Sequence, residues 1–140
     1  MEKLSYSCYQ KTLVFAQFDL AEGLGGKVDF MFIKTEEGKE IIKKRAIIND
    51  MLYGNIPVVQ PTDFIILKLM AIANNPGRSI KDEADISFCF ELYKNENIRK
   101  DFDPINKDKI LKFAGRFGHM GLIEKYFKKY NSGEKGYFII

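Results

Sequence analysis

The sequence has no tryptophan, one histidine and only two cysteines, so it offers few residues for metal or redox chemistry. Cys8 and Cys89 lie far apart and form neither a C-x-x-C motif nor a zinc-ligand spacing. We expect two free thiols in a reducing compartment. Neither sign of charge dominates, because 22 basic and 19 acidic residues leave a formal net charge of +3. That charge is too small to indicate nucleic acid as a partner, although it is compatible with an anionic ligand.

The sequence also lacks a long uninterrupted apolar run. The longest one, TDFIILKLMAIANNP (62–76), is broken by Lys68 and is shorter than the roughly 20 residues that cross a bilayer. The N-terminal stretch MEKLSYSCYQK has no apolar segment of signal-peptide length. We therefore predict a cytoplasmic protein with no membrane partner.

What remains is an ordinary globular composition, with 46% hydrophobic and 29% charged residues. A chain of 140 residues fits one domain, and at this length folding buries roughly two-thirds of the surface of the unfolded chain. We predict a single domain over residues 1–140.

Two strands joined by a glycine-rich turn open the chain. Lys11–Leu20 (KTLVFAQFDL) and Lys27–Lys34 (KVDFMFIK) are rich in Val and Phe, and AEGLGG separates them. The pattern predicts a β-hairpin. Asp29 shares a face of the second strand with Met31 and Ile33. Since both faces of this strand are mainly apolar, we expect it to be covered on two sides.

Helices dominate the remainder of the predicted fold. We expect a helix over Thr35–Asp50, then an edge strand in GNIPVVQP, where Pro57 excludes a central position. The further helices are expected from Thr62 (as N-cap) to about residue 74, from Ser79 to about Tyr93, from Asp103–Pro104 onwards, and over LIEKYFKKY, with a short terminal strand in GYFII. The sequence thus predicts an α+β fold, with a small mixed sheet in residues 1–60 and a helical portion in 61–140.

Lys68 is the unusual residue of this pattern. Its helix face carries Phe64, Ile65, Ala71 and Ile72, so its ammonium needs to reach solvent, an acid or an anionic ligand. The turn NNPG is short, which predicts that the flanking helices run antiparallel. Counting outwards from Pro76 brings Lys68 close to Asp85. An ion pair between these two residues is one interpretation, and an anionic ligand is the other.

The segment GRSIKDEADI (77–86) places several charges at the start of the following helix. Ser79-Ile80-Lys81-Asp82 fits a capping box, which by itself explains Asp82. Arg78 and Lys81 stand at the helix end that disfavours cations. A bound anion accounts for this placement, and so does a solvated surface.

Three separated motifs, VDFMFI, IPVVQPTDFIILKLMA and GRSIKDEADI, resemble the second half of bacterial nucleotidyltransferases of the DNA polymerase β superfamily. The closest resemblance is to nucleotidyltransferases of abortive-infection and toxin–antitoxin systems. It covers residues 27–92, about half the chain, with one extra residue between Arg78 and Lys81. The resemblance implies a catalytic, Mg²⁺-binding role for Asp29. It implies nucleotide binding by Lys68, Arg78 and Lys81, with Asp82 and Asp85 supporting the site.

The resemblance is incomplete where the chemistry is most demanding. Two-metal phosphoryl transfer needs several carboxylates, which the family supplies as a Gly-Ser turn followed by a D-x-D pair. Neither precedes Asp29 here. The D-x-D at Asp101–Asp103 follows the last motif, and we interpret it as a polar linker with Asp103 as a helix N-cap.

These observations leave three hypotheses. The chain is a truncated or split nucleotidyltransferase that completes its site with another chain carrying the missing motif. Alternatively, it is a degenerate homologue that binds Mg-NTP weakly, or a non-catalytic interaction domain of antitoxin-like or scaffolding type. A sheet that lacks its usual N-terminal cover would expose an apolar face, so we also expect a homo-oligomer as a possible state. The expected ligand is an NTP with Mg²⁺.

Overall fold

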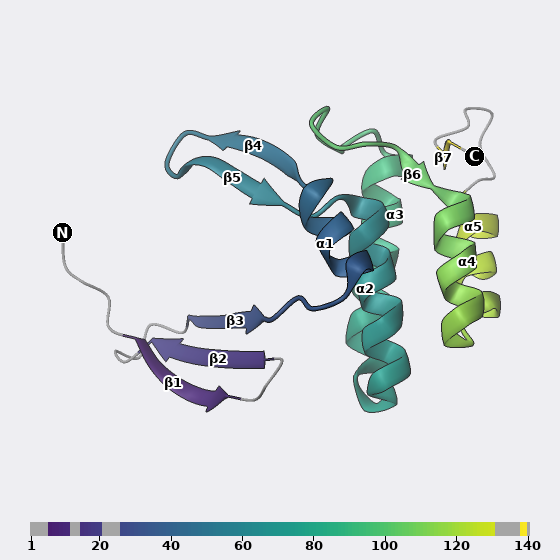
Figure 1. The fold of residues 1–140 in the computed structure, drawn as a ribbon. Helices are drawn as coiled ribbons and strands as arrows, with labels where there is room; N and C mark the ends of the chain where they lie inside the picture. The colour runs from purple at the N-terminus through teal and green to yellow at the C-terminus, as the bar shows by residue number, and fades with distance from the viewer. Residues whose placement is uncertain (1–5, 12–14, 21–25, 131–137, 140) are drawn as a thin grey trace. The chain divides into compact units, whose positions relative to one another are not determined.

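The computed structural model describes residues 6–11, 15–20, 26–130 and 138–139 of the chain (Figure 1). Its helices and small sheets make a mixed α+β fold, which confirms the predicted fold class. The chain divides into two compact units, Met1–Glu40 and Ile41–Ile140, which are described separately below. The single domain over 1–140 stays a prediction.

The N-terminal unit contains an antiparallel sheet in the order β1-β2-β3. Its strands are β1 (Tyr6–Lys11), β2 (Phe15–Leu20) and β3 (Lys27–Met31). The predicted pairing of β2 with β3 is confirmed. Residues 12–14 of the predicted first strand and 21–25 of the glycine turn lie outside the described residues. Strand β1 was not predicted, because YSCYQK lacks an apolar alternation.

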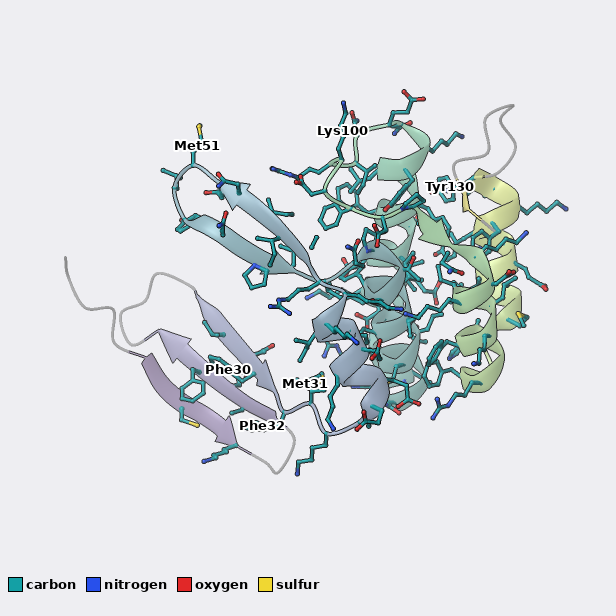
Figure 2. All side chains as sticks on the ribbon, turned by 45° about the horizontal axis from the view of Figure 1, so that its top comes forward. Phe30, Met31, Phe32, Met51, Lys100 and Tyr130 are labelled. Atoms are coloured by element: carbon teal, nitrogen blue, oxygen red, sulfur yellow. The ribbon has the colours of Figure 1, made fainter. Side chains whose placement is uncertain are left out.

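The two-sided cover expected for the second strand is wrong. Most of β3 is exposed, including Phe30 and Met31, and so is the following Phe32 (Figure 2). Phe30 makes an edge-to-face contact with Phe18 on β2, with ring centroids 5.5 Å apart. Apolar side chains on both faces make a strand suitable for burial between two layers. Burial also requires other elements that pack on each face, and a strand pattern does not predict those.

Helix α1 (Glu36–Lys43) starts where predicted but is shorter. The Gly38 N–H donates to Thr35 Oγ1 at 3.1 Å, which satisfies one free donor of the first turn. The helix expected up to Asp50 is wrong, because Ala46–Asp50 forms strand β4 and pairs antiparallel with β5 (Gly54–Val58). This pairing satisfies the backbone of the β-branched pair Ile47–Ile48 in an extended form. The edge position of Pro57 is confirmed, because the sheet has two strands.

Helices α2 (Pro61–Asn74) and α3 (Ser79–Lys94) form a hairpin around the short 3₁₀ turn η1 (Pro76–Arg78). The N-caps predicted at Thr62 and, in the capping box, at Ser79 are both wrong. Gln60 occupies the N-cap of α2, and Thr62 Oγ1 instead accepts a hydrogen bond from the Asn106 N–H at 2.9 Å. Arg78 occupies the N-cap of α3 without a side-chain cap bond. Pro61 takes the first helical position, where its missing N–H costs nothing.

The C-terminal segment contains β6 (Ile105–Asn106), α4 (Lys107–Phe117), α5 (Met120–Tyr130) and β7 (Phe138–Ile139). The helix start predicted at Asp103–Pro104 is wrong, because Asn106 caps α4 by accepting from the Lys109 N–H at 2.9 Å. Gly118 ends α4 in the left-handed region, with φ +74°. The predicted terminal strand is confirmed, since β7 pairs in parallel with β6.

Helices α2 to α5 enclose one apolar core. Phe90 on α3 is fully buried and stacks on Tyr126 and Tyr130 of α5, at centroid distances of 5.8 and 5.7 Å. Stacked and edge-to-face aromatic contacts add to the free energy that area burial provides. Among the described helices, none has the length and apolar character needed to cross a membrane.

Candidate functional site

Lys68 lies between two carboxylates of helix α3. Its Nζ is 2.6 Å from Asp85 Oδ2 and 2.9 Å from Asp82 Oδ1. The ion pair predicted from the helix count, Lys68 with Asp85, is confirmed. Asp82 joins it because residues three apart share a helix face, so one ammonium can reach both acids. The capping role expected for Asp82 is wrong, since its Oδ1 accepts from Lys68.

This cluster fixes the charge of Lys68. Burial by itself lowers the pKa of the ammonium, but hydrogen bonds and charges from Asp85 and Asp82 outweigh burial and raise it. Asp82 is only 1% exposed, and within the described residues its Oδ2 atom has no hydrogen-bond partner. A buried polar atom of this kind needs a donor, such as a water molecule or a ligand group.

Arg78 and Lys81, the other two basic residues of the candidate site, are exposed. No acid in the described part of the chain pairs with either of them. Lys81 precedes Asp85 by four residues and therefore lies on the same face of α3. The two cations are thus free to meet an anion from solvent, whereas Lys68 is already engaged.

A pocket of about 240 Å³ lies further along the same hairpin. Ten residues line it, from the end of β5, helices α2 and α3, and the connector after α3: Val58, Val59, Pro61, Phe64, Asp85, Phe88, Cys89, Leu92, Ile98 and Phe102. Asp85 is the only charged residue among them. Burial raises the pKa of the Cys89 thiol to about 12, so this side chain lines the pocket as an uncharged group. The Lys68 ammonium lies 5.4 Å from the centroid of the Phe64 ring.

The connector after α3 is held in place by hydrogen bonds to its backbone. The Asp103 N–H donates to Gln60 Oε1 at 3.0 Å, and the Tyr93 hydroxyl donates to the Asp103 carbonyl. Asp101 pairs with Arg99, with 3.1 Å between Nε and Oδ2. The interpretation of the D-x-D at 101–103 as a polar linker is confirmed, although Asp103 is not the N-cap of α4.

Asp29, the predicted metal ligand, is an exposed residue of β3 in the N-terminal unit. It lies opposite Gln17 in the strand register, and Gln17 Nε2 donates to Asp29 Oδ1 at 2.8 Å. No group of three His, Cys, Asp or Glu side chains that could hold a metal ion occurs among the described residues. One carboxylate beside an amide does not fit a two-metal centre, which needs several oxygen ligands from acids.

Sequence reasoning missed a second ion pair in the helical unit. Lys109 Nζ on α4 is 2.5 Å from Asp63 Oδ1 on α2, and the Asp63 side chain is almost fully buried. The two residues are 46 positions apart, so local spacing gives no indication that they meet. An acid at the start of an otherwise apolar helix was the one available signal.

Comparisons with protein-family models, with curated proteins and with solved structures find no match for this chain. The resemblance to nucleotidyltransferases therefore stays a prediction that depends on the three motifs.

Proposed function

We propose that the C-terminal unit binds a nucleoside triphosphate along one face of the α2–α3 hairpin, as the nucleotide-holding part of a nucleotidyltransferase-like protein. One observation carries this proposal. Lys81, Asp85, Phe88 and Leu92 follow one another at spacings of three and four residues, which aligns them along one side of α3. Arg78 lies in η1, directly before this helix. The row begins with two free cations and ends at the apolar pocket.

This order of groups matches the chemistry of a nucleotide. The phosphates suit Arg78 and Lys81, because guanidinium and ammonium groups donate charge-assisted hydrogen bonds to phosphate oxygens. The base suits the pocket, where Phe64 and Phe88 offer aromatic surface for stacking. Lys68 acts here through Asp85 and Asp82, by holding α2 and α3 together beneath the row.

We further propose that the chain does not catalyse nucleotidyl transfer alone. The described residues offer Asp29 as a single candidate carboxylate, and the sequence before it has no D-x-D. Catalysis would require further acids besides those of the described residues, for example from a second chain. A degenerate homologue that binds the nucleotide weakly is equally consistent with these residues.

A protein-interaction role is the second candidate. The exposed apolar residues of β3 and its end, Phe30, Met31 and Phe32, favour it. A domain of this kind would retain a stable partner in pull-down experiments when the cations of α3 are replaced.

Calorimetric titration with ATP, GTP, CTP and UTP, each with and without Mg²⁺, tests the proposed function. We expect micromolar to millimolar binding that Arg78→Glu/Lys81→Glu weakens by about tenfold or more, equivalent to about 1.4 kcal/mol. The matched control is Lys112→Glu/Lys125→Glu, which makes the same charge change on α4 and α5. Absence of heat with every nucleotide would remove the proposal.

The variant Asp29→Asn separates the two versions of the site. If Asp29 contributes a metal ligand, its replacement abolishes the part of the binding that depends on Mg²⁺. If the helical unit alone binds the nucleotide, the affinity stays unchanged. A stable partner in pull-downs, unaffected by either set of substitutions, would instead favour the interaction domain.

A further inference from the structure

Asp85 lies between the cations at the start of α3 and the apolar pocket. It follows Lys81 by four residues and precedes Phe88 by three, so the rise of the helix separates them by about 6 and 4.5 Å along its axis. Asp85 also lines the pocket, and it is the one charged residue that does so. A molecule that contacts both the cations and the pocket therefore has a carboxylate beside its middle portion.

The Asp85 carboxylate has acceptor positions that the fold leaves unused. Its Oδ2 atom lies 2.6 Å from Lys68 Nζ, and within the described residues Lys68 is the only ionic or hydrogen-bond partner of this side chain. The side chain is 38% exposed, so solvent reaches it. Two carboxylate oxygens offer about four lone-pair positions, and an ionised carboxylate accepts hydrogen bonds without donating any. The group that Asp85 selects must therefore be a hydrogen-bond donor.

The sugar is the part of a nucleotide that lies between its phosphates and its base. With the phosphates at Arg78 and Lys81 and the base in the pocket, the sugar comes next to Asp85. Phosphate oxygens carry negative charge and repel a carboxylate, whereas the 2′- and 3′-hydroxyls of ribose are adjacent donors. Acidic side chains accept from the ribose 2′-hydroxyl in dinucleotide-binding folds. The amino groups of the bases lie farther from the sugar, where the remaining side chains of the pocket are uncharged.

We propose that Asp85 makes this site selective for ribonucleotides over 2′-deoxyribonucleotides, by accepting hydrogen bonds from the ribose hydroxyls. The inference rests on the proposed function, because that function places the sugar between the cations and the pocket. Asp85 then has two partners, the Lys68 ammonium on α2 and the ribose on its exposed side. Lys68 is a positioning residue in this arrangement, since it fixes the carboxylate without contacting the sugar.

Calorimetric titration of the full chain with matched pairs of nucleotides tests the selectivity. Each ribonucleoside triphosphate is compared with the 2′-deoxy form of the same base, for example ATP with 2′-dATP, so that stacking in the pocket is equal within a pair. We expect the ribonucleotide to bind about tenfold more tightly, as the loss of one hydrogen bond to a charged group predicts. Equal affinities within every pair would overturn this inference and leave the proposed function standing. Absence of binding by every nucleotide would overturn both.

Replacing Asp85 tests whether this residue is the source of the selectivity. Asp85→Ala should bring the ratio of the two affinities close to one, mainly by weakening the ribonucleotide. Asp85→Asn keeps the shape of the side chain and should reduce the ratio as well, because an amide has one acceptor oxygen and no charge. The matched control is Glu83→Ala, which removes an acid from α3 at a position that does not line the pocket. Circular dichroism shows whether each variant keeps the fold.

The ratio of affinities separates a direct contact from a structural role. If Asp85 only held α2 and α3 together, its replacement would change both affinities by the same factor and leave their ratio as in the parent. If it accepted from a base instead, its replacement would change the preference among bases and not the ratio within a pair. Either result, or a ratio that Glu83→Ala reduces equally, would overturn the assignment to Asp85.

Discussion

The Lys68 ammonium lies 2.9 Å from Asp82, a carboxylate that is 1% exposed and that would otherwise be buried among apolar helix faces. A buried charge without a partner of opposite sign lowers the stability of the folded state, so Asp82 and Lys68 each need the other. It connects α2 to α3 beneath the proposed nucleotide-binding row, and it therefore determines how firmly that row is positioned.

Replacing Lys68 by Met should lower the free energy of unfolding by about 3 kcal/mol, because Asp82 is left without its cation. The double variant Lys68→Met/Asp82→Leu should recover much of this loss, since both charges are then absent. Asp85→Asn serves as the control. The Asp85 side chain is 38% exposed, so its loss should cost less than about 1 kcal/mol. Urea unfolding of the parent and the three variants measures these losses, and equal losses for Lys68→Met and the double variant would contradict the assignment.

The Asp63–Lys109 pair offers a matched test on α4. Lys109→Met should destabilise the protein by about 3 kcal/mol, because it leaves the buried Asp63 unpaired. Lys112→Met makes the same change at an exposed position of that helix and should stay within about 0.5 kcal/mol of the parent. Thermal unfolding of both variants gives the comparison. Similar losses of stability in the two variants would indicate that the net charge of α4, rather than the ion pair with Asp63, determines the effect.

Local patterns predicted the elements whose neighbours in space are also neighbours in sequence. The α2–α3 hairpin follows from one apolar run, a short turn and a second helical run, and counting across that turn found Asp85. The count did not identify Asp82 as a partner of Lys68, because a capping box explains the same residue locally. Asp63 was missed because its partner, Lys109, belongs to α4. The position of α4 depends on the packing of the whole core, so local spacing does not predict it.

Strand β4 shows a different limit. Residues 35–50 contain enough helix-forming residues to predict one helix, yet Ile47 and Ile48 are extended because β5 pairs with them. The pairing depends on a turn in which Asp50 binds two backbone N–H groups and Gly54 adopts a positive φ. An Asp followed four residues later by Gly, after two isoleucines, was the available signal. For β3, the pattern predicted the strand but not its exposure.

The free energy of unfolding should fall as the pH rises above about 9. Burial raises the pKa of Cys89 from 9.0 to about 12, burial raises the pKa of Tyr93 and of Tyr126, and the net effect on the pKa of Lys68 is also upward. In each case the folded state holds the proton more tightly than the unfolded state does. The stability is therefore fully present below the unfolded pKa and is lost as the pH rises towards the folded pKa, by on the order of 1 kcal/mol per pH unit and group.

Urea midpoints at pH 7, 9, 10 and 11 measure this loss. Cys89→Ala should reduce the slope between pH 9 and 11, whatever its effect on stability at pH 7, because one titrating group is gone. Cys8→Ala makes the same substitution at an exposed thiol and serves as the control. A midpoint that rises with pH would contradict the sign of this argument.

Gly38 and Gly121 should respond in opposite ways to replacement by alanine. Alanine in a helix is normally more stable than glycine by about 0.5–1 kcal/mol. Around Gly121, near the start of α5, no described atom other than its chain neighbours and the backbone of its own helix lies within 4 Å of an added Cβ. Gly121→Ala should therefore raise the free energy of unfolding by about 0.5 kcal/mol. At Gly38 in α1, the added Cβ would overlap Cγ2 of Ile33, and Thr35 Oγ1 is 3.2 Å away. Gly38→Ala should therefore destabilise the N-terminal unit by about 1–3 kcal/mol, as overpacking does.

Hydrogen exchange of the α1 amides in both variants tests this difference. We expect Gly38→Ala alone to speed exchange in α1. Slower exchange in Gly38→Ala would show that Ile33 does not pack against this helix.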